Sequence, residues 1–134
     1  MKLRSLVLTA AAAACFLTAC TSVHSTMSIN GHQFGPDQCR TGQDAEFFGV
    51  DLKDDPGTTL RLVANPDETV DVIVIPDDGT EPIAMAGCAN LDLRPSSRDS
   101  HGYYTIDGNA TVSCTGAAYT VVGTTEFQDC HHDY

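Results

Sequence analysis

The stretch TLRLVANPDETVDVIVI, residues 59–75, decides the fold class of this chain. Polar and apolar side chains alternate through residues 59–63, which is typical of a β-strand with one buried face. Residues 70–75 are the most β-prone run in the sequence, and Asn-Pro-Asp at 65–67 is a turn signal between the two runs. We therefore expect two strands joined by a turn.

The same pattern of β-prone runs separated by turn signals continues on both sides of this stretch. Further strands are expected over residues 45–52, 82–86, 90–93 and 118–127, with turn signals such as Asp-Asp-Pro-Gly at 54–57 between them. No segment after residue 20 keeps apolar side chains at a period of 3.6 over three turns. Short strands at this spacing predict an all-β fold, either a single antiparallel β-sandwich or a small barrel.

Two segments near the C-terminus are similar to each other. Residues 104–111 (YTIDGNAT) and 119–126 (YTVVGTTE) both place a glycine four residues after a tyrosine. We interpret them as two similar strands of one sheet, with Gly108 and Gly123 at bulges or kinks. For residues 107–109 a tight turn between two strands is the alternative to a bulge within one long strand.

The N-terminus has the features of an export signal. Lys2 and Arg4 are followed by thirteen uncharged, mostly apolar residues, Ser5 to Leu17. A membrane-spanning helix needs about twenty such residues, so this length suits a cleaved helical signal segment instead. An ordinary secretory signal that ends in a small-residue cleavage site is the alternative.

The signal segment closes with Leu17-Thr18-Ala19-Cys20, which resembles the lipobox of bacterial lipoproteins. The resemblance implies that Cys20 receives a diacylglyceryl group, that residues 1–19 are removed, and that the new amino group is often acylated, for example with palmitate. Ala12-Ala13-Ala14-Cys15 fits this pattern less well, because it lacks the aliphatic residue. Over its last thirty residues the chain also resembles the mycobacterial lipoprotein antigens of the 19-kDa type. The paired strand motif and the terminal cysteine carry that second resemblance.

The mature chain is strongly acidic. Loss of Lys2 and Arg4 leaves five Lys/Arg against 18 Asp/Glu, so the formal charge changes from −11 to −13. A field of this sign repels nucleic acid and anionic lipid headgroups, so we expect neither to be a partner. We expect the acidity to keep an exported protein soluble. Attraction to a cationic protein, a cationic peptide or a metal ion is the alternative.

Four cysteines remain after Cys20: Cys39, Cys88, Cys114 and Cys130. An even number in an exported domain predicts two disulfides. A thiolate metal site is not indicated, since there is no C-x-x-C pair. Four cysteines allow three pairings, and we expect Cys88 with Cys114 and Cys39 with Cys130, because meandering strands would bring these ends together.

Motifs for catalysis or metal binding are weak. Ser100-His101 beside Asp99 has residue types used in acyl transfer, but adjacent side chains point apart, and we predict a loop and no catalytic residues. The tail residues His131, His132 and Asp133 are weak candidates for a transition metal. Turn carboxylates are candidate Ca²⁺ ligands, although Asp also favours turns for backbone reasons. These carboxylates are Asp51, Asp54 and Asp55, and also Asp77, Asp78 and Glu81.

These patterns predict a signal peptide over 1–19, a lipid-anchored tether over 20–26, a β domain over 27–130 and a flexible tail over 131–134. We expect a cell-envelope lipoprotein without a cofactor, held to the membrane through the lipid on Cys20. It would lie in the outer membrane of a cell with two membranes, and otherwise on the outer face of the plasma membrane. A structural or recognition role is favoured. The alternatives are an inhibitor of a basic envelope-attacking enzyme such as lysozyme, and an enzyme whose site is not visible in the sequence.

Overall fold

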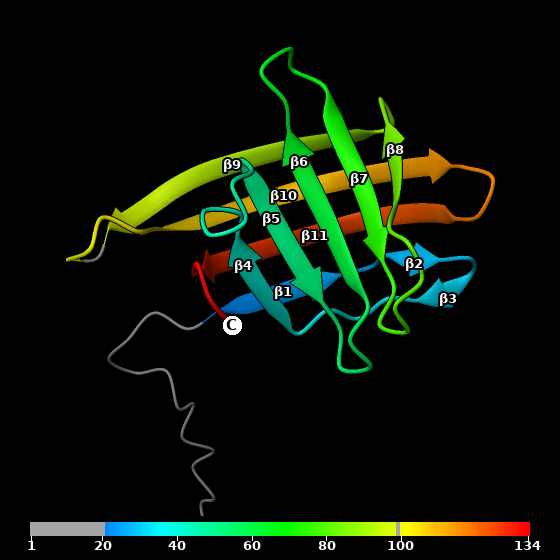
Figure 1. Ribbon diagram of the computed structural model, residues 1–134, viewed down its shortest axis with the longest axis horizontal. Helices are drawn as coiled ribbons and strands as arrows, with labels where there is room; N and C mark the ends of the chain where they lie inside the picture. Colours follow the sequence, from blue (N-terminus) through cyan, green and yellow to red (C-terminus); the bar gives the residue numbers. More distant parts are fainter. Residues whose placement is uncertain (1–20, 99) are drawn as a thin grey trace, which may run out of the picture.

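The computed structural model describes residues 21–98 and 100–134, and these residues form two antiparallel sheets without any helix (Figure 1). The six-stranded sheet has the order β3-β2-β11-β10-β9, with β1 also paired to β11. It consists of β1 (Ser22–Ser25), β2 (Ser28–Ile29), β3 (His32–Gln33), β9 (Ala89–Arg98), β10 (Tyr104–Thr115) and β11 (Thr120–Cys130). The five-stranded sheet has the order β4-β5-β6-β7-β8. It consists of β4 (Gln38–Thr41), β5 (Gly49–Lys53), β6 (Thr59–Ala64), β7 (Val70–Ile75) and β8 (Ile83–Ala86).

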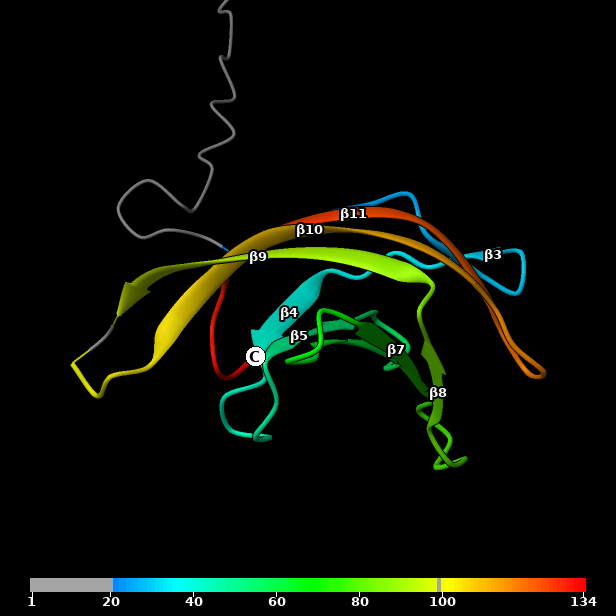
Figure 2. The same cartoon turned by 90° about the horizontal axis from the view of Figure 1, so that it is seen from above.

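The two sheets pack face to face, and the six-stranded sheet arches over the five-stranded one (Figure 2). Burial alternates along β6 and β7, as the sequence pattern predicts, so that every second side chain enters the core. The core between the sheets is mainly aliphatic and contains two buried aromatic rings, Phe34 and Phe127. Its fully buried members include Met27, Val50, Leu52, Leu60, Leu62, Val72, Ile106, Val112 and Val121. The predicted antiparallel β-sandwich is confirmed.

Both disulfides form with the expected pairing. Cys39–Cys130 joins β4 of the five-stranded sheet to the end of β11 in the six-stranded sheet. Cys88–Cys114 lies within the six-stranded sheet, where Cys88 precedes β9 and Cys114 is part of β10. Within residues 21–98 and 100–134, no cysteine is free. One bridge therefore ties the two layers together, and the other fixes the entry to an edge strand.

The similar segments 104–111 and 119–126 lie in neighbouring strands, and residues 107–109 belong to one long strand, β10, not to a tight turn. The register of β10 against β11 shifts between Ile106 and Gly108, but the extra residue lies in β11, where residues 128–129 oppose Asp107 alone and Asp129 has φ +58°. The bulge expected at Gly108 is therefore wrong, whereas Gly123 does mark an irregular position. A Cβ on Gly108 would lie 2.2 Å from the carbonyl oxygen of Asp92. Gly123 has φ +138°, and a Cβ there would lie 2.6 Å from the Cα of Met27. A larger residue at either position would displace neighbouring backbone, in β9 for Gly108 and between β1 and β2 for Gly123.

Two predicted strand boundaries are wrong. Residues 42–48 form a turn before β5 and not the start of a strand, and Glu46 within them has a positive φ of 61°. The strand expected over residues 90–93 is longer than predicted, since β9 runs from Ala89 to Arg98 and continues past Pro95. Proline is tolerated because β9 is an edge strand. The carbonyl oxygen of Cys88 accepts a hydrogen bond from the N–H of Ser113 in β10. Backbone groups of successive residues in a strand point alternately to its two sides, and Pro95 is seven residues further on. Its nitrogen therefore faces the unpaired edge of β9, where no N–H is needed.

The boundary of the predicted tether is also wrong. Residues 22–25 are not a free linker, since they form β1 and pair with residues 125–128 of β11. Thr21 is attached as well, because its hydroxyl donates a hydrogen bond of 3.0 Å to the carbonyl oxygen of Asp129. The folded domain thus includes residues 21–25. The signal segment and Cys20 lie outside the described residues.

Candidate functional site

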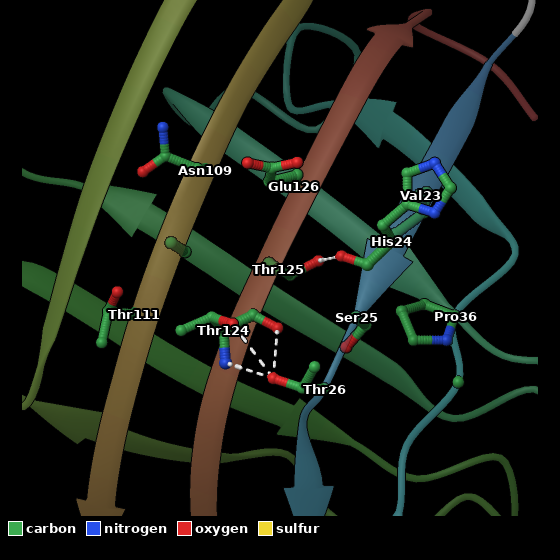
Figure 3. A pocket seen from close by; sticks show the side chains of 12 residues that line it. Val23, His24, Ser25, Thr26, Pro36, Asn109, Thr111, Thr124, Thr125 and Glu126 are labelled. Atoms are coloured by element: carbon green, nitrogen blue, oxygen red, sulfur yellow. Dashed lines mark hydrogen bonds between the residues drawn. The ribbon is translucent and has the colours of Figure 1, made fainter.

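A shallow hollow lies on the outer face of the six-stranded sheet (Figure 3). It has a volume of about 730 Å³ and is bounded by β1, β10, β11 and residues 35–36. Because these strands send their apolar side chains into the core, their alternate positions are free to be polar. The outward side chains in the hollow are hydroxyls, an amide and two ionisable groups: His24, Thr26, Asn109, Thr111, Thr124 and Glu126.

Two rows of cross-strand neighbours make up this surface. In one row Thr26 and Thr124 approach to 3.0 Å between their hydroxyl oxygens, and Thr111 pairs with Thr124 from β10. In the other row Glu126 of β11 lies between His24 of β1 and Asn109 of β10. All of these side chains are exposed. Such groups can donate and accept hydrogen bonds to a polar ligand, but water competes for them and solvates the charges.

A second polar cluster lies on the outer face of the five-stranded sheet. Asp51 points away from the core yet is fully buried, because its cross-strand neighbours Arg40 and Arg61 cover it. Arg61 Nε lies 2.8 Å from Asp51 Oδ1, and Arg40 Nε lies 3.2 Å from Asp51 Oδ2. This hydrogen-bonded carboxylate raises the pKa of Arg61 above its ordinary value.

Aromatic rings close this cluster from the outside. The guanidinium of Arg61 lies 4.3 Å from the ring centroid of Phe47, and that of Arg40 lies 4.8 Å from the ring centroid of Tyr134. The Lys53 ammonium is 5.0 Å from the same tyrosine ring. Burial and the nearby Asp51 carboxylate raise the pKa of Tyr134. Both carboxylate oxygens of Asp51 are bound by arginines of the neighbouring strands, so Asp51 links these strands and has no oxygen left to bind a ligand.

Two of the carboxylates considered for Ca²⁺, Asp54 and Asp78, accept hydrogen bonds within their own turns. Asp54 Oδ1 accepts hydrogen bonds from the backbone N–H groups of Gly57 and Thr58 at 3.0 and 2.8 Å. Asp78 accepts from Thr80, and these hydrogen bonds lower the pKa of Asp78. Within the part of the chain that the structure describes, no three His, Cys, Asp or Glu side chains are grouped to hold a metal ion.

The tail residues proposed as metal ligands are docked on the sandwich and turn to different partners. The carbonyl oxygen of His131 accepts a 2.6 Å hydrogen bond from Thr41, and its ring Nε2 lies 3.7 Å from Asp129. The ring of His132 stacks on Tyr103, with 4.0 Å between centroids. His131, His132 and Asp133 therefore do not converge, and residues 131–134 are not a free end. Residues 100–101 lie in the turn between β9 and β10, while Asp99 lies outside the described residues.

Acidic side chains gather on two neighbouring turns of the five-stranded sheet. A Cβ on Gly57 in the β5–β6 turn would lie 3.2 Å from the Cβ of Asp77 in the β7–β8 turn. Five carboxylates share this end: Asp54, Asp55, Asp77, Asp78 and Glu81. All but Asp54 are exposed, so the pair of turns forms a negative surface. The sequence revealed these acids but not their proximity.

Comparison with known proteins gives no relative from which a role could be transferred. The chain matches no family model, no curated protein and no solved structure. Among the described residues there is also no helix long and apolar enough to cross a membrane.

Proposed function

We propose that this chain is an exported bacterial lipoprotein, anchored through Cys20, whose β-sandwich has a structural or recognition role in the cell envelope. The observation that carries the proposal is Leu17-Thr18-Ala19-Cys20 at the end of an uncharged stretch preceded by Lys2 and Arg4. A lipobox of this form specifies both cleavage and the site of lipid attachment. Two acyl chains or more would make the anchor stable, where one chain alone is marginal.

The disulfides support export. Cys39–Cys130 and Cys88–Cys114 account for the cysteines of the described domain, and such bonds persist in oxidising compartments outside the cytosol. A recognition role without catalysis is supported by the hollow on the six-stranded sheet. Its ionisable members, His24 and Glu126, are exposed, whereas catalytic acids and bases need partly buried surroundings that shift their pKa values.

Inhibition of a cationic enzyme is the second candidate, and the paired acidic turns favour it. Their exposed carboxylates could meet the basic surface of an enzyme such as lysozyme, mainly by raising the association rate. The test is binding and inhibition of lysozyme by residues 21–134 at low and physiological salt, with Asp77→Asn/Asp78→Asn as the matched variant. Inhibition that persists at physiological salt and weakens in the variant would support this candidate. Binding that disappears with salt, without inhibition, would reduce it to nonspecific attraction.

The anchor is tested by replacing each cysteine of the leader in turn. Cys20→Ser should release the protein from membranes or stall its processing, while Cys15→Ser, the matched control, should leave membrane partitioning unchanged. Cell fractionation followed by detection of the C-terminal domain gives the readout. Unchanged partitioning of Cys20→Ser would contradict the proposal, and loss of anchoring in Cys15→Ser would move the lipid to the other cysteine.

A further inference from the structure

We infer that the anchored domain stands directly on the bilayer, with the end of the sandwich that contains Thr21 against the lipid headgroups. The inference rests on the proposed function, because it takes Cys20 as the lipid-bearing residue. It names a partner surface, the headgroup layer, and an orientation of the domain on it.

The distance between the anchor and the folded sheet carries the argument. Thr21 follows Cys20 directly, is hydrogen-bonded to Asp129, and leads into Ser22, which pairs with Gln128 in β11. A residue spans at most about 3.6 Å, so the backbone of the lipid-bearing Cys20 lies within roughly 7 Å of Ser22, the first residue of the sheet. The headgroup layer is itself about 5–7 Å thick on each side of the bilayer. The start of β1 therefore cannot leave this layer.

The residues around Thr21 form what we call the anchor end. Thr21, Gln38, His131 and Tyr134 line one hollow of about 310 Å³, and Gln128 lies opposite Ser22. Figure 1 shows the C-terminus close to the start of β1. The opposite end is the turn between β10 and β11, beside β8. A Cβ on Gly116 in that turn would lie 3.1 Å from the sulfur of Met85.

Charge is distributed in a way that favours this orientation. The Lys and Arg side chains of residues 21–134 are Arg40, Lys53, Arg61, Arg94 and Arg98, on β4, β5, β6 and the last part of β9. β4 is tied to the C-terminal end of β11 by Cys39–Cys130, and β9 ends beside the first residues of β10. By contrast β7, β8 and the turn between them hold four carboxylates and none of the Lys or Arg: Asp71, Asp77, Asp78 and Glu81.

An anionic membrane surface would act differently on the two sides of the domain because of this charge asymmetry. Lys and Arg near such a surface are each attracted by about 1 kcal/mol, and carboxylates are repelled. Asp37, Asp129 and Asp133 also belong to the anchor end, and Arg40 and Arg61 share the Asp51 carboxylate, so charge does not hold the domain down by itself. The lipid supplies the attachment, and repulsion of the β7–β8 side turns that side toward water.

The absence of tryptophan from the sequence permits a clean reporter experiment. Gln128→Trp and Thr120→Trp place one indole at each end of β11, at exposed positions on the same face of the strand. Eight residues separate them, about 27 Å in an extended strand. Each full-length lipoprotein is reconstituted into vesicles of phosphatidylcholine and phosphatidylglycerol that carry a nitroxide quencher on the headgroup.

Gln128→Trp should be quenched several-fold more strongly than Thr120→Trp. A ten-residue Gly/Ser insertion between Thr21 and Ser22 adds a reach of about 17 Å and should bring the two values together. The acyl mass on Cys20 is measured on the same samples. Absence of that mass would overturn the anchor and this inference with it. Acylated protein with equally weak quenching at both positions would overturn only the inference, and equally strong quenching would show a domain lying flat.

Discussion

Removal of the Cys39–Cys130 disulfide should destabilise the domain more than removal of Cys88–Cys114. The two bridges close loops of very different length, with sequence separations of 91 and 26 residues. In the chain-entropy model these loops correspond to about 4.6 and about 3.5 kcal/mol. The constant term of the model cancels in the difference of about 1.1 kcal/mol, which depends only on the ratio of the two loop lengths.

The structure suggests that side-chain voids will not hide this difference. Cys39 and Cys130 are both buried, whereas Cys88 is half-buried beside the buried Cys114, so the loss of sulfur packing acts in the same direction as the loop lengths. The assay is urea denaturation of residues 21–134 as wild type, Cys39→Ala/Cys130→Ala and Cys88→Ala/Cys114→Ala. Equal losses of unfolding free energy, or a larger loss for the shorter loop, would refute the argument from loop closure.

Three further predictions concern single sites. Asp51→Asn should lower the unfolding free energy by about 2–4 kcal/mol, since it leaves Arg40 and Arg61 without their shared carboxylate. A charge-free Arg40→Met/Asp51→Leu/Arg61→Met variant should lose less, and a larger loss would contradict this account. Gly123→Ala should cost about 2–3 kcal/mol more than Gly79→Ala in denaturation, because both have positive φ but only Gly123 would meet a neighbouring backbone. The pKa of Tyr134 is raised in the folded protein, so as the pH rises this tyrosine ionises first in the unfolded chain. The contribution of Tyr134 to the free energy of unfolding is therefore complete below about pH 10 and is lost as the pH rises further. Tyr134→Phe should remove that part of the alkaline loss in a pH titration of stability, and an identical profile would exclude Tyr134 as its source.

The fold class could be predicted because its signals are local. Alternation in residues 59–63 and the β-branched run at 70–75 each specify a strand without reference to the rest of the chain, and β6 and β7 follow them closely. The disulfide pairing was also accessible, because a meandering antiparallel chain brings Cys88 near Cys114. Gly123 could be placed at an irregular position from its matching surroundings, whereas Gly108 is regularly paired and the bulge lies beside it in β11.

The features that sequence reasoning missed depend on pairing between distant strands. Residues 22–25, Ser-Val-His-Ser, contain only one apolar side chain, so nothing in them distinguishes a tether from a strand. They become β1 because β11 offers an unpaired edge more than a hundred residues away in the sequence. The cluster around Asp51 depends in the same way on the register that aligns Arg40, Asp51 and Arg61 across three strands. The one signal in the sequence was Asp51 itself, a carboxylate within an otherwise apolar strand. The sequence did not show that Arg40 and Arg61 would be its partners.

The docked tail also changes the interpretation of the C-terminus. As a sequence, residues 131–134 resemble a frayed polar end. In the structure the Cys39–Cys130 bridge holds the preceding residue, and Tyr134 contacts Arg40 and Lys53 on the neighbouring sheet. Packing against the sandwich therefore explains the polar residues 131–134 without a metal site.

The most direct test of the central proposal is the mass of the N-terminal peptide of the protein isolated from membranes. We predict a peptide that begins at Cys20 and carries a diacylglyceryl group, with residues 1–19 absent. A peptide that retains the leader, or one that begins at Cys20 or beyond without acyl mass, would contradict the lipid anchor.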